Sequence, residues 1–453
     1  MINVDQVGKP RVLVAATDPL TATMPGPSIR AWHLAHVLAA ECEVALVSTV
    51  AADRTSDVVT VGYADSAEVE RLTEWMDVAF VPPGMLRHSP ALSASEKPLI
   101  IDVYDPFHLE NLEPDGRSSP HERDATVTHL NGVLNEAFAR GDFFCCASER
   151  QRDFWLGSLT AAGRVNPYTY AEDPNLSRLI DVVPFGLATA APQRRGPGLR
   201  GVVDGIGAHE KVILWGGGVY NWFDPGSLLY AIDRLRQSVP EVRLVFLGMG
   251  HPNPAIPEMR VAVEARALSD HLGLTGTHVF FKEGWVPFDS RADVLLDADV
   301  AVSTHLTHIE TRFSFRTRVL DYLWAGLPMV LTGGDTLAEL VAAQGAGVTV
   351  PPGDVEAIAE GLALMLRQPP PPEAAKSLAA QFSWETVARP LLEFCRSPRI
   401  APDRAARRVP VDERPPHANP EPVPLGHVGQ HLARAAVGAH RARSWAAALR
   451  SRT

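Results

Sequence analysis

Short apolar runs that alternate with helical segments constrain this sequence more than any other feature. The runs are near-continuous and rich in Val, Ile and Leu, which is typical of strands buried on both faces of a parallel sheet. The pattern predicts strands at 11–17, 43–48, 78–81, 99–103, 143–146 and 181–183, and helices at 28–40, 122–140 and 149–159. Strand–helix–strand units in this order predict a doubly wound α/β domain.

The same pattern starts again after a segment at 190–207 that is rich in Pro, Gly and Arg, which we expect to be a linker. It predicts strands at 212–215, 243–247, 278–281, 300–302, 329–331 and 347–350, and helices at 225–238, 258–272, 316–325 and 355–366. We therefore expect two Rossmann-like domains, an N-terminal one at 1–190 and a C-terminal one at 205–370. Ligands bind at the carboxyl ends of the strands in open α/β sheets, so the cleft between the domains is the expected site.

Charge is unevenly distributed along the chain. The formal net charge is −11, but residues 397–453 contain ten Arg, no Lys and four acidic residues, which gives this tail +6 and leaves −17 for residues 1–396. The acidic body argues against a nucleic-acid partner. We expect the Pro/Arg-rich tail to be either disordered or a basic helix that contacts an anionic membrane surface. The residues that suggest this contact are Arg434, Arg441, Arg443, Trp445, Leu449 and Arg450.

Two further features bear on the compartment. The four Cys residues have neither the number nor the spacing of a disulfide framework or a zinc site. The N-terminus lacks the pattern of a signal peptide, and no apolar run reaches the length of a membrane span. We expect a cytoplasmic protein, with peripheral contact to the inner face of the plasma membrane as the alternative. The abundance of Ala, Arg and Pro suggests a bacterial source.

Two glycine turns follow predicted strands, one in each domain. Gly26 precedes the first helix, where free backbone N–H groups attract an anion, and Arg30 adds a positive charge. Gly217 and Gly218 follow the first strand of the second domain, where glycine allows a phosphate or a ring to approach the backbone. Aromatic residues that could stack on a sugar or base, or fill the domain core, surround this second turn: Trp215, Tyr220, Trp222 and Phe223.

The stretch 303–328 holds the densest group of charged residues. Arg316 and Arg318 could grip a diphosphate, and Glu310 and Asp321 could bind sugar hydroxyls. A solvated charged face is the plain alternative.

Two patterns resemble metal sites. His305 and His308 precede Glu310, but no third ligand accompanies them at metal-site spacing, so we expect no metal. Asp297 and Asp299 form an Asp-x-Asp pattern directly before a strand, which we expect to be structural.

At this stretch the sequence resembles the retaining glycosyltransferases of family 4, also called glycosyl transferases group 1, which have the GT-B fold. The resemblance covers most of residues 10–396 and is stronger in the second half. It is carried by segments 321–328, 183–186 and 382–384, by Arg318, by the loop at Gly333 and Gly334 with Glu339, and by Gly26.

The resemblance implies a role for each matching residue. It implies donor binding by Gly217, Gly218, Arg316, Arg318, Gly333, Gly334 and Glu339, and catalytic roles for Glu310, Asp321, Tyr104 and Asp105. It implies acceptor binding by Gly26, Arg30, Asp102 and His108. It also implies that residues 380–396 form a helix that crosses back to the first domain.

Two departures from the family pattern stand out. The segment 217–224 lacks the Arg and Lys that hold the donor diphosphate in many members, so we infer that Arg316 or Arg318 supplies the charge. The first Glu of the family's Glu pair would fall on Phe313, so the pair here would be Glu310 and Asp321.

The resemblance implies transfer of a hexose from a nucleoside-diphosphate sugar to a hydroxyl of a glycan, a lipid-linked acceptor or a small molecule. It implies retention of anomeric configuration, no cofactor and a place in polysaccharide or glycoconjugate synthesis. Two alternatives stay open: a nucleotide-sugar epimerase of the same fold, and a catalytically silent binding partner of another glycosyltransferase. A phosphorylase with a pyridoxal group would need a lysine to hold that group. The lysines of the second domain and the segment after it (Lys211, Lys282 and Lys376) lie in no sequence context that suggests this role.

Overall fold

The computed structural model describes residues 8–250, 253 and 256–408. The tail residues named above from 434 onward lie outside the described residues, so the predicted membrane contact of the tail is not addressed by the structure. Residues 1–403 form one compact unit, which contains both predicted domains. No helix of the described part is both long and apolar enough to cross a membrane.

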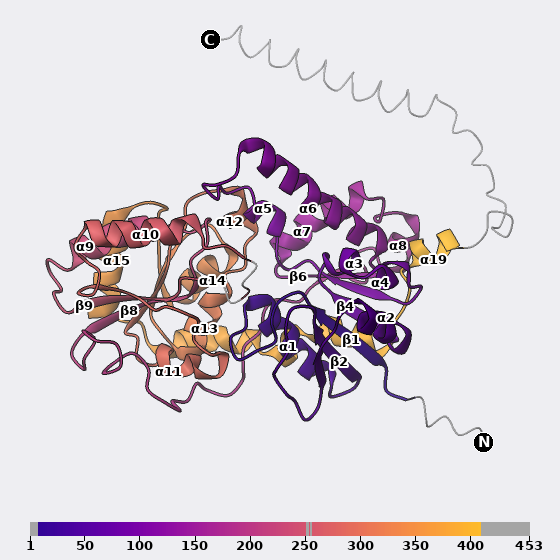
Figure 1. The fold of residues 1–453 in the computed structure, drawn as a ribbon, viewed down its shortest axis with the longest axis horizontal. Helices are drawn as coiled ribbons and strands as arrows, with labels where there is room; N and C mark the ends of the chain where they lie inside the picture. The colour runs from indigo at the N-terminus through magenta and orange to yellow at the C-terminus, as the bar shows by residue number, and fades with distance from the viewer. Residues whose placement is uncertain (1–7, 251–252, 254–255, 409–453) are drawn as a thin grey trace, which may run out of the picture. The chain divides into compact units, whose positions relative to one another are not determined.

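The first domain is built on a parallel sheet of seven strands in the order β3-β2-β1-β4-β5-β6-β7 (Figure 1). The strands are β1 (Arg11–Ala16), β2 (Glu43–Ser48), β3 (Thr60–Tyr63), β4 (Val78–Val81), β5 (Leu99–Asp102), β6 (Phe143–Cys146) and β7 (Ile180–Val182). The helices are α1 (Gly26–Leu38), α2 (Ser66–Trp75), α3 (Met85–His88), α4 (Pro90–Ala94), α5 (Phe107–Glu110), α6 (Pro120–Arg140), α7 (Glu149–Ala161) and α8 (Pro167–Glu172).

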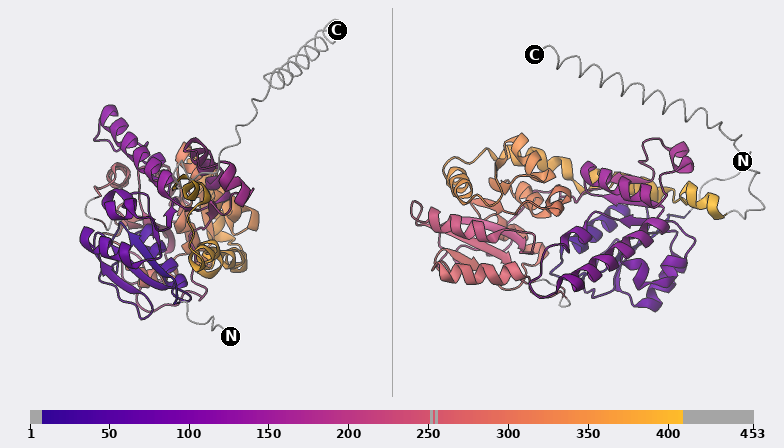
Figure 2. Two further views of the ribbon diagram at one scale, coloured as in Figure 1. Left: turned by 90° about the vertical axis from the view of Figure 1, so that its right-hand side faces the viewer. Right: turned by 90° about the horizontal axis from the view of Figure 1, so that it is seen from above.

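Alternation along β1 explains why its run of apolar residues is continuous. Val12 and Val14 pack into one core cluster, whereas Leu13 and Ala15 pack into another on the opposite face of the sheet. Helices cover both faces, as Figure 2 shows from two sides, so both sets of side chains are buried. The predicted strands of this domain are confirmed to within one or two residues.

The second domain has a parallel sheet of six strands in the order β10-β9-β8-β11-β12-β13. The strands are β8 (Lys211–Gly218), β9 (Val242–Gly248), β10 (Val279–Phe281), β11 (Val300–Ser303), β12 (Met329–Thr332) and β13 (Gly347–Val350). The helices are α9 (Pro225–Leu235), α10 (Arg260–His271), η1 (Phe288–Ser290), α11 (Arg291–Leu295), α12 (Ile309–Phe313), α13 (Thr317–Ala325), α14 (Thr336–Gln344), α15 (Val355–Arg367) and α16 (Pro372–Ala379). Both sheets are doubly wound, as the sequence predicts.

The predicted crossing helix is two helices rather than one. After η2 (Ala380–Phe382) come α17 (Trp384–Val387) and α18 (Arg389–Arg396), and Pro390 lies in the first turn of the second. Proline has no N–H to continue the preceding helix, so the chain turns at Ala388. Trp384 and Phe394 share one core cluster with residues of both sheets, so this segment joins the two domains.

Backbone hydrogen bonds join the end of the first domain, at Leu187, to the crossing helices. Leu187 N donates to Phe382 O at 2.6 Å, and Trp384 N donates to Leu187 O at 3.2 Å. Gly186 lies directly beneath the Trp384 ring, because a Cβ at that glycine would come within 2.5 Å of the ring. The two motifs at 183–186 and 382–384 therefore meet in space.

The first domain continues past the predicted start of the tail at 397. Helix α19 (Pro402–Arg408) follows, and Asp403 in its first turn is fully buried in an ion pair with Arg164 at 2.7 Å. Ala401 N also donates to Asp142 Oδ1 at 2.8 Å. Residues 397–403 thus belong to the first domain, because they satisfy two of its buried polar groups.

Candidate active site

A cleft of about 540 Å³ lies between the two domains, at the carboxyl ends of their central strands. Segments that follow β1 and β5 form the first-domain wall, and segments that follow β8 and β11 form the second-domain wall. This is the position that the two-domain pattern predicts. Its lining includes charged, aromatic and small residues of both domains: Asp18, Gly26, Tyr104, Asp105, Glu110, Glu113, Asp115, Arg123, Tyr220, Trp222, Phe223, Glu310, Arg316, Thr317 and Arg318.

Glu310 and Arg316 form a buried ion pair on the second-domain wall. Glu310 begins α12 and Arg316 precedes α13, and the turn between these helices lets their side chains meet. The two guanidinium N–H groups donate to the two carboxylate oxygens at 2.7 and 2.6 Å. The Arg316 guanidinium also lies 4.8 Å from the centre of the Phe223 ring. The pair therefore presents a fixed, aromatic-backed guanidinium at the cleft.

Arg318 stabilises the glycine turn at the end of β8. Its Nη2 donates to Gly218 O at 2.6 Å, and its guanidinium lies 4.1 Å from the Phe223 ring centre and 4.7 Å from that of Trp215. Burial lowers the pKa of this guanidinium to about 10. Arg318 thus holds the glycine turn and the aromatic wall together while it lines the cleft.

Gly217 and Gly218 lie at the end of β8, where the register against β9 shifts. Gly217 has φ of 77°, a conformation that glycine adopts without strain. Tyr322 from α13 accepts a hydrogen bond from Gly216 N at 2.7 Å. The glycine turn is therefore braced from below by α13, and neither Gly217 nor Gly218 is among the residues that line the cleft.

Four other residues predicted in the second domain lie away from the cleft lining. Asp321 pairs with Arg291 at 3.2 Å, and burial raises the pKa of its carboxyl. Glu339 pairs with Arg150 of the first domain at 2.9 Å, and Gly334 O accepts from the same arginine at 3.3 Å. Gly333 N donates to Val350 O at 3.1 Å. The structure thus brings Glu310 and Arg316 together but separates Asp321 from them.

Gly26 and Tyr104 meet at the first-domain wall. A Cβ at Gly26 would lie 3.5 Å from the Tyr104 hydroxyl and 3.9 Å from Thr317 Oγ1 of the second domain. Gly26 therefore lies where the two walls meet, at ordinary contact distance from both. Burial raises the pKa of the Tyr104 phenol well above its usual value.

The other predicted acceptor residues lie beneath the first-domain wall rather than on it. Arg30 is fully buried, and its guanidinium pairs with Asp102 at 2.7 and 2.9 Å and donates to Pro184 O at 2.9 Å. Its guanidinium also lies 4.7 Å from the Tyr104 ring centre. The pair thus supports Tyr104 from behind. His108 packs against Phe154 and Trp155, and burial lowers its pKa to about 4.

Asp105 and Glu110 form a carboxyl pair on the first-domain wall. The two groups hydrogen-bond to each other, and burial raises the pKa of Asp105 to about 6 and that of Glu110 well above its usual value. Across the cleft, the charge of Glu310 raises both pKa values and the charge of its partner Arg316 lowers them. The sequence analysis missed Glu110, because α5 is a single turn without a periodic pattern and its link to Asp105 exists only in the folded chain.

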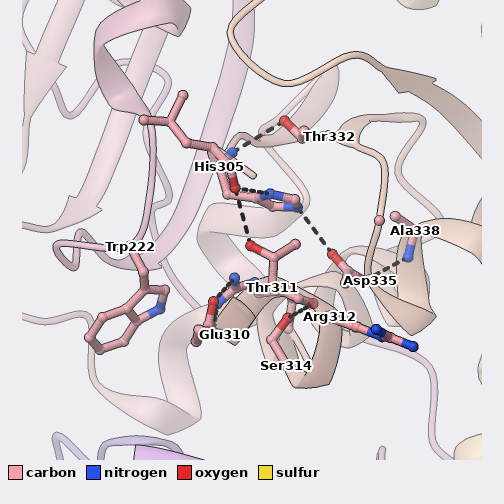
Figure 3. A network of polar contacts seen from close by, with 12 residues as sticks. Trp222, His305, Glu310, Thr311, Arg312, Ser314, Thr332, Asp335 and Ala338 are labelled. Carbon is pink, nitrogen blue, oxygen red and sulfur yellow. Dashed lines mark hydrogen bonds and ion pairs between the residues drawn. The ribbon is translucent and has the colours of Figure 1, made fainter. Parts of the chain in front are cut away.

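The histidines of the 303–328 stretch have structural contacts (Figure 3). His305 N donates to Thr332 Oγ1 at 3.2 Å, and its ring lies 3.4 Å from Asp335. His308 caps α12 by accepting from Thr311 N, and its Nε2 lies 2.9 Å from Trp222 O. Within the described residues, no group of three or more His, Cys, Asp or Glu is placed to hold a metal ion.

Asp297 and Asp299 tie the linker to the second domain, as the sequence predicts for a structural pair. Asp297 accepts from Leu199 N at 2.5 Å and from Arg200 N at 2.9 Å. Asp299 accepts from Val212 N at 2.7 Å.

Comparison with known proteins agrees with this architecture. Residues 210–368 match the family described as Glycosyl transferases group 1. The matched segment corresponds to the second domain, from β8 to α15. No curated protein matches the chain in a sequence search.

Solved structures extend the likeness to both domains. Sucrose-phosphate synthase of Thermosynechococcus elongatus superposes with a TM-score of 0.58 at 15% identity, over 86% of this chain and 98% of that one. HepE of Anabaena in complex with UDP-glucose superposes with a TM-score of 0.59 at 16% identity, over 84% of this chain and 98% of that one. A trehalose-6-phosphate enzyme of E. coli bound with UDP-2-fluoro glucose superposes with a TM-score of 0.57 at 11% identity, over 85% of this chain and 99% of that one. The chain has the GT-B fold.

Proposed function

We propose that this GT-B chain is a glycosyltransferase that moves a hexose from a nucleoside-diphosphate sugar to an acceptor hydroxyl with retention of configuration. The observation that carries the proposal is the buried Arg316–Glu310 pair, which presents a guanidinium at the wall of the cleft in the domain that matches the glycosyltransferase family. HepE in complex with UDP and glucose is consistent with a nucleotide-sugar donor in such a cleft.

The chemistry suits a preorganised cation. The acceptor oxygen forms a bond to the anomeric carbon while the bond from that carbon to the diphosphate oxygen breaks, and the hydroxyl proton leaves with the nucleoside diphosphate. Negative charge develops on the leaving diphosphate, which an oriented guanidinium stabilises strongly in a water-poor cleft. Arg316 fills this role, with Nε still free of a hydrogen-bond partner among the described residues. The proposal requires no metal ion.

A silent binding partner remains the second candidate function. It is favoured by the fact that Arg316 is already paired with Glu310 and that Arg318 is already bonded to Gly218 O. The cytoplasmic placement, the membrane contact of the tail and the class of acceptor remain proposals of the same kind.

The first test is nucleotide binding and turnover. The full chain is titrated by calorimetry with UDP, GDP, dTDP and ADP sugars, and release of the nucleoside diphosphate is followed with and without acceptors. We expect one donor to bind and Arg316→Ala to weaken it roughly 10- to 100-fold, since a hydrogen bond to a charged group contributes about 1.5–3 kcal/mol. The control is Arg367→Ala, which removes an exposed arginine from α15.

A second variant separates binding from folding. Arg316→Ala leaves Glu310 buried without its partner and is expected to lower the melting temperature. The double change Glu310→Gln with Arg316→Gln removes both charges and keeps two groups that hydrogen-bond. If the folded double variant binds the donor as tightly as the wild type, Arg316 does not hold the diphosphate. Binding without turnover would instead favour the silent partner, and conversion of the donor without transfer would favour the epimerase.

A further inference from the structure

The first-domain wall of the cleft carries five carboxylates that form no ion pair with the described residues: Asp18, Asp105, Glu110, Glu113 and Asp115. Elsewhere in the described chain many carboxylates have an arginine partner, such as Asp77 with Arg11 at 2.9 Å. The one cation on this wall among the described residues, Arg123, donates to Leu112 O at 3.2 Å. The wall therefore carries a local excess of negative charge.

The five carboxylates differ in how they are held. Asp115 accepts hydrogen bonds from Arg117 N and from Ser118, so its own loop satisfies it. Asp18 accepts from Asn253 Nδ2 at 3.2 Å. Among the described residues, Asp105 and Glu110 have only each other as a side-chain hydrogen-bond partner, and burial raises the pKa of both carboxyls, so a proton is held between them. Of the five carboxylates, this pair would gain most from a bound cation, because the cation would offset the repulsion between the two charges.

A second observation points to a ligand of the opposite charge in the same cleft. On the opposite wall, Arg316 Nε and Arg318 Nη1 have no hydrogen-bond partner among the described residues, although these side chains are more than nine-tenths buried. Both arginines line the cleft. Each guanidinium has a partner at its other nitrogens and one nitrogen without an acceptor, which suits an anionic group, so we assign the donor diphosphate to that wall. The acidic wall is left for the acceptor.

We propose that the acceptor carries a protonated amine, as in an amino sugar or an aminocyclitol, and that Asp105 and Glu110 bind this amine while a neighbouring hydroxyl receives the sugar. The inference rests on the proposed function, because it assigns the acceptor of the same cleft. An ammonium group donates three hydrogen bonds and allows both carboxyls to ionise, so it replaces the shared proton. A phosphorylated or acidic acceptor would be repelled by the same wall.

The test compares amines with neutral molecules of similar shape. Binding of the full chain is measured by calorimetry at pH 7 in the presence of saturating UDP. The matched probes are glucosamine against glucose, galactosamine against galactose, and 2-deoxystreptamine against inositol. We expect at least one amine to bind 10-fold or more tightly than its neutral counterpart, with a preference that falls as salt rises. If no amine binds more tightly than its neutral counterpart, the proposal is wrong.

Variants then locate the preference. Glu110→Gln and Asp105→Asn are each expected to reduce the ratio of amine to neutral affinity at least 5-fold. Glu70→Gln removes an exposed carboxylate from α2, far along the chain from the cleft residues, and is expected to keep the ratio. An unchanged ratio in both cleft variants would overturn the assignment.

The UDP titration keeps the two proposals separate. UDP binding without an amine preference would leave the glycosyltransferase proposal standing and reject the amine acceptor. Amine binding by a chain that binds no nucleotide sugar would reject the glycosyltransferase proposal and with it the role of the amine as acceptor, and would leave Asp105 and Glu110 as an amine-binding site only.

Discussion

Glu110 shows how one carboxyl sets the pH response of the cleft. Because the folded pKa of the Asp105–Glu110 pair is raised, with Asp105 at about 6, the folded chain holds more protons than the unfolded chain above pH 4. Stability is therefore lost as pH rises through 6. Glu110→Gln leaves an amide that can donate to Asp105 as the protonated carboxyl does, but the variant needs no proton uptake on folding. We expect its melting temperature to exceed that of the wild type at pH 7.5, by on the order of 1–3 °C.

The comparison at pH 5.0 is the internal control. The wild-type pair is already protonated there, so the advantage of Glu110→Gln should shrink. Thermal unfolding followed by circular dichroism at the two pH values measures it, with Glu70→Gln alongside. An equal shift at both pH values would contradict the shared proton.

At the scale of elements, the contact between Gly186 and Trp384 fastens the first domain to α17. Gly186→Ala places a Cβ within 2.5 Å of the Trp384 ring, so the ring or the strand end must move. We expect a loss of about 1–3 kcal/mol in the free energy of unfolding, measured by urea denaturation. The control is Gly157→Ala in α7, where nothing lies within 4 Å and alanine should stabilise the helix by up to ~1 kcal/mol. Equal effects of the two changes would rule out the close packing.

The helices and strands could be predicted from the sequence, but most contacts between them could not. Strands such as β2 and β4 are continuous apolar runs, and a local pattern is enough to place them. The break between α17 and α18 comes from Pro390, a local signal that the sequence analysis did not use. The ion pair of Arg30 with Asp102 joins residues 72 positions apart, so an arginine at a helix start could equally have faced a ligand. Side chains of this kind are assigned by tertiary packing, which one sequence does not display.

At the scale of the whole molecule, the contacts of residues 397–408 decide how the basic tail can be studied. A chain that ends at 397 loses Asp403, and Arg164 then stays fully buried without its carboxylate. Removing one member of a buried ion pair costs about 3–5 kcal/mol. The same truncation takes away Ala401 N, the donor to Asp142. A chain that ends at 408 keeps both contacts.

We therefore expect deletion of residues 398–453 to lower the melting temperature by several degrees relative to deletion of residues 409–453. Asp403→Asn in the full chain should reproduce much of the loss, because it removes the charge and one of the two oxygens that accept from Arg164. Equal melting temperatures for the two truncated chains would show that residues 398–408 do not stabilise the first domain. Any loss of liposome association by the chain that ends at 397 would reflect damage to the first domain as well as loss of the tail. The chain that ends at 408 lacks six of the ten arginines beyond Arg396 and keeps the first domain intact, so it is the one that tests whether the basic tail brings an otherwise acidic chain to a membrane.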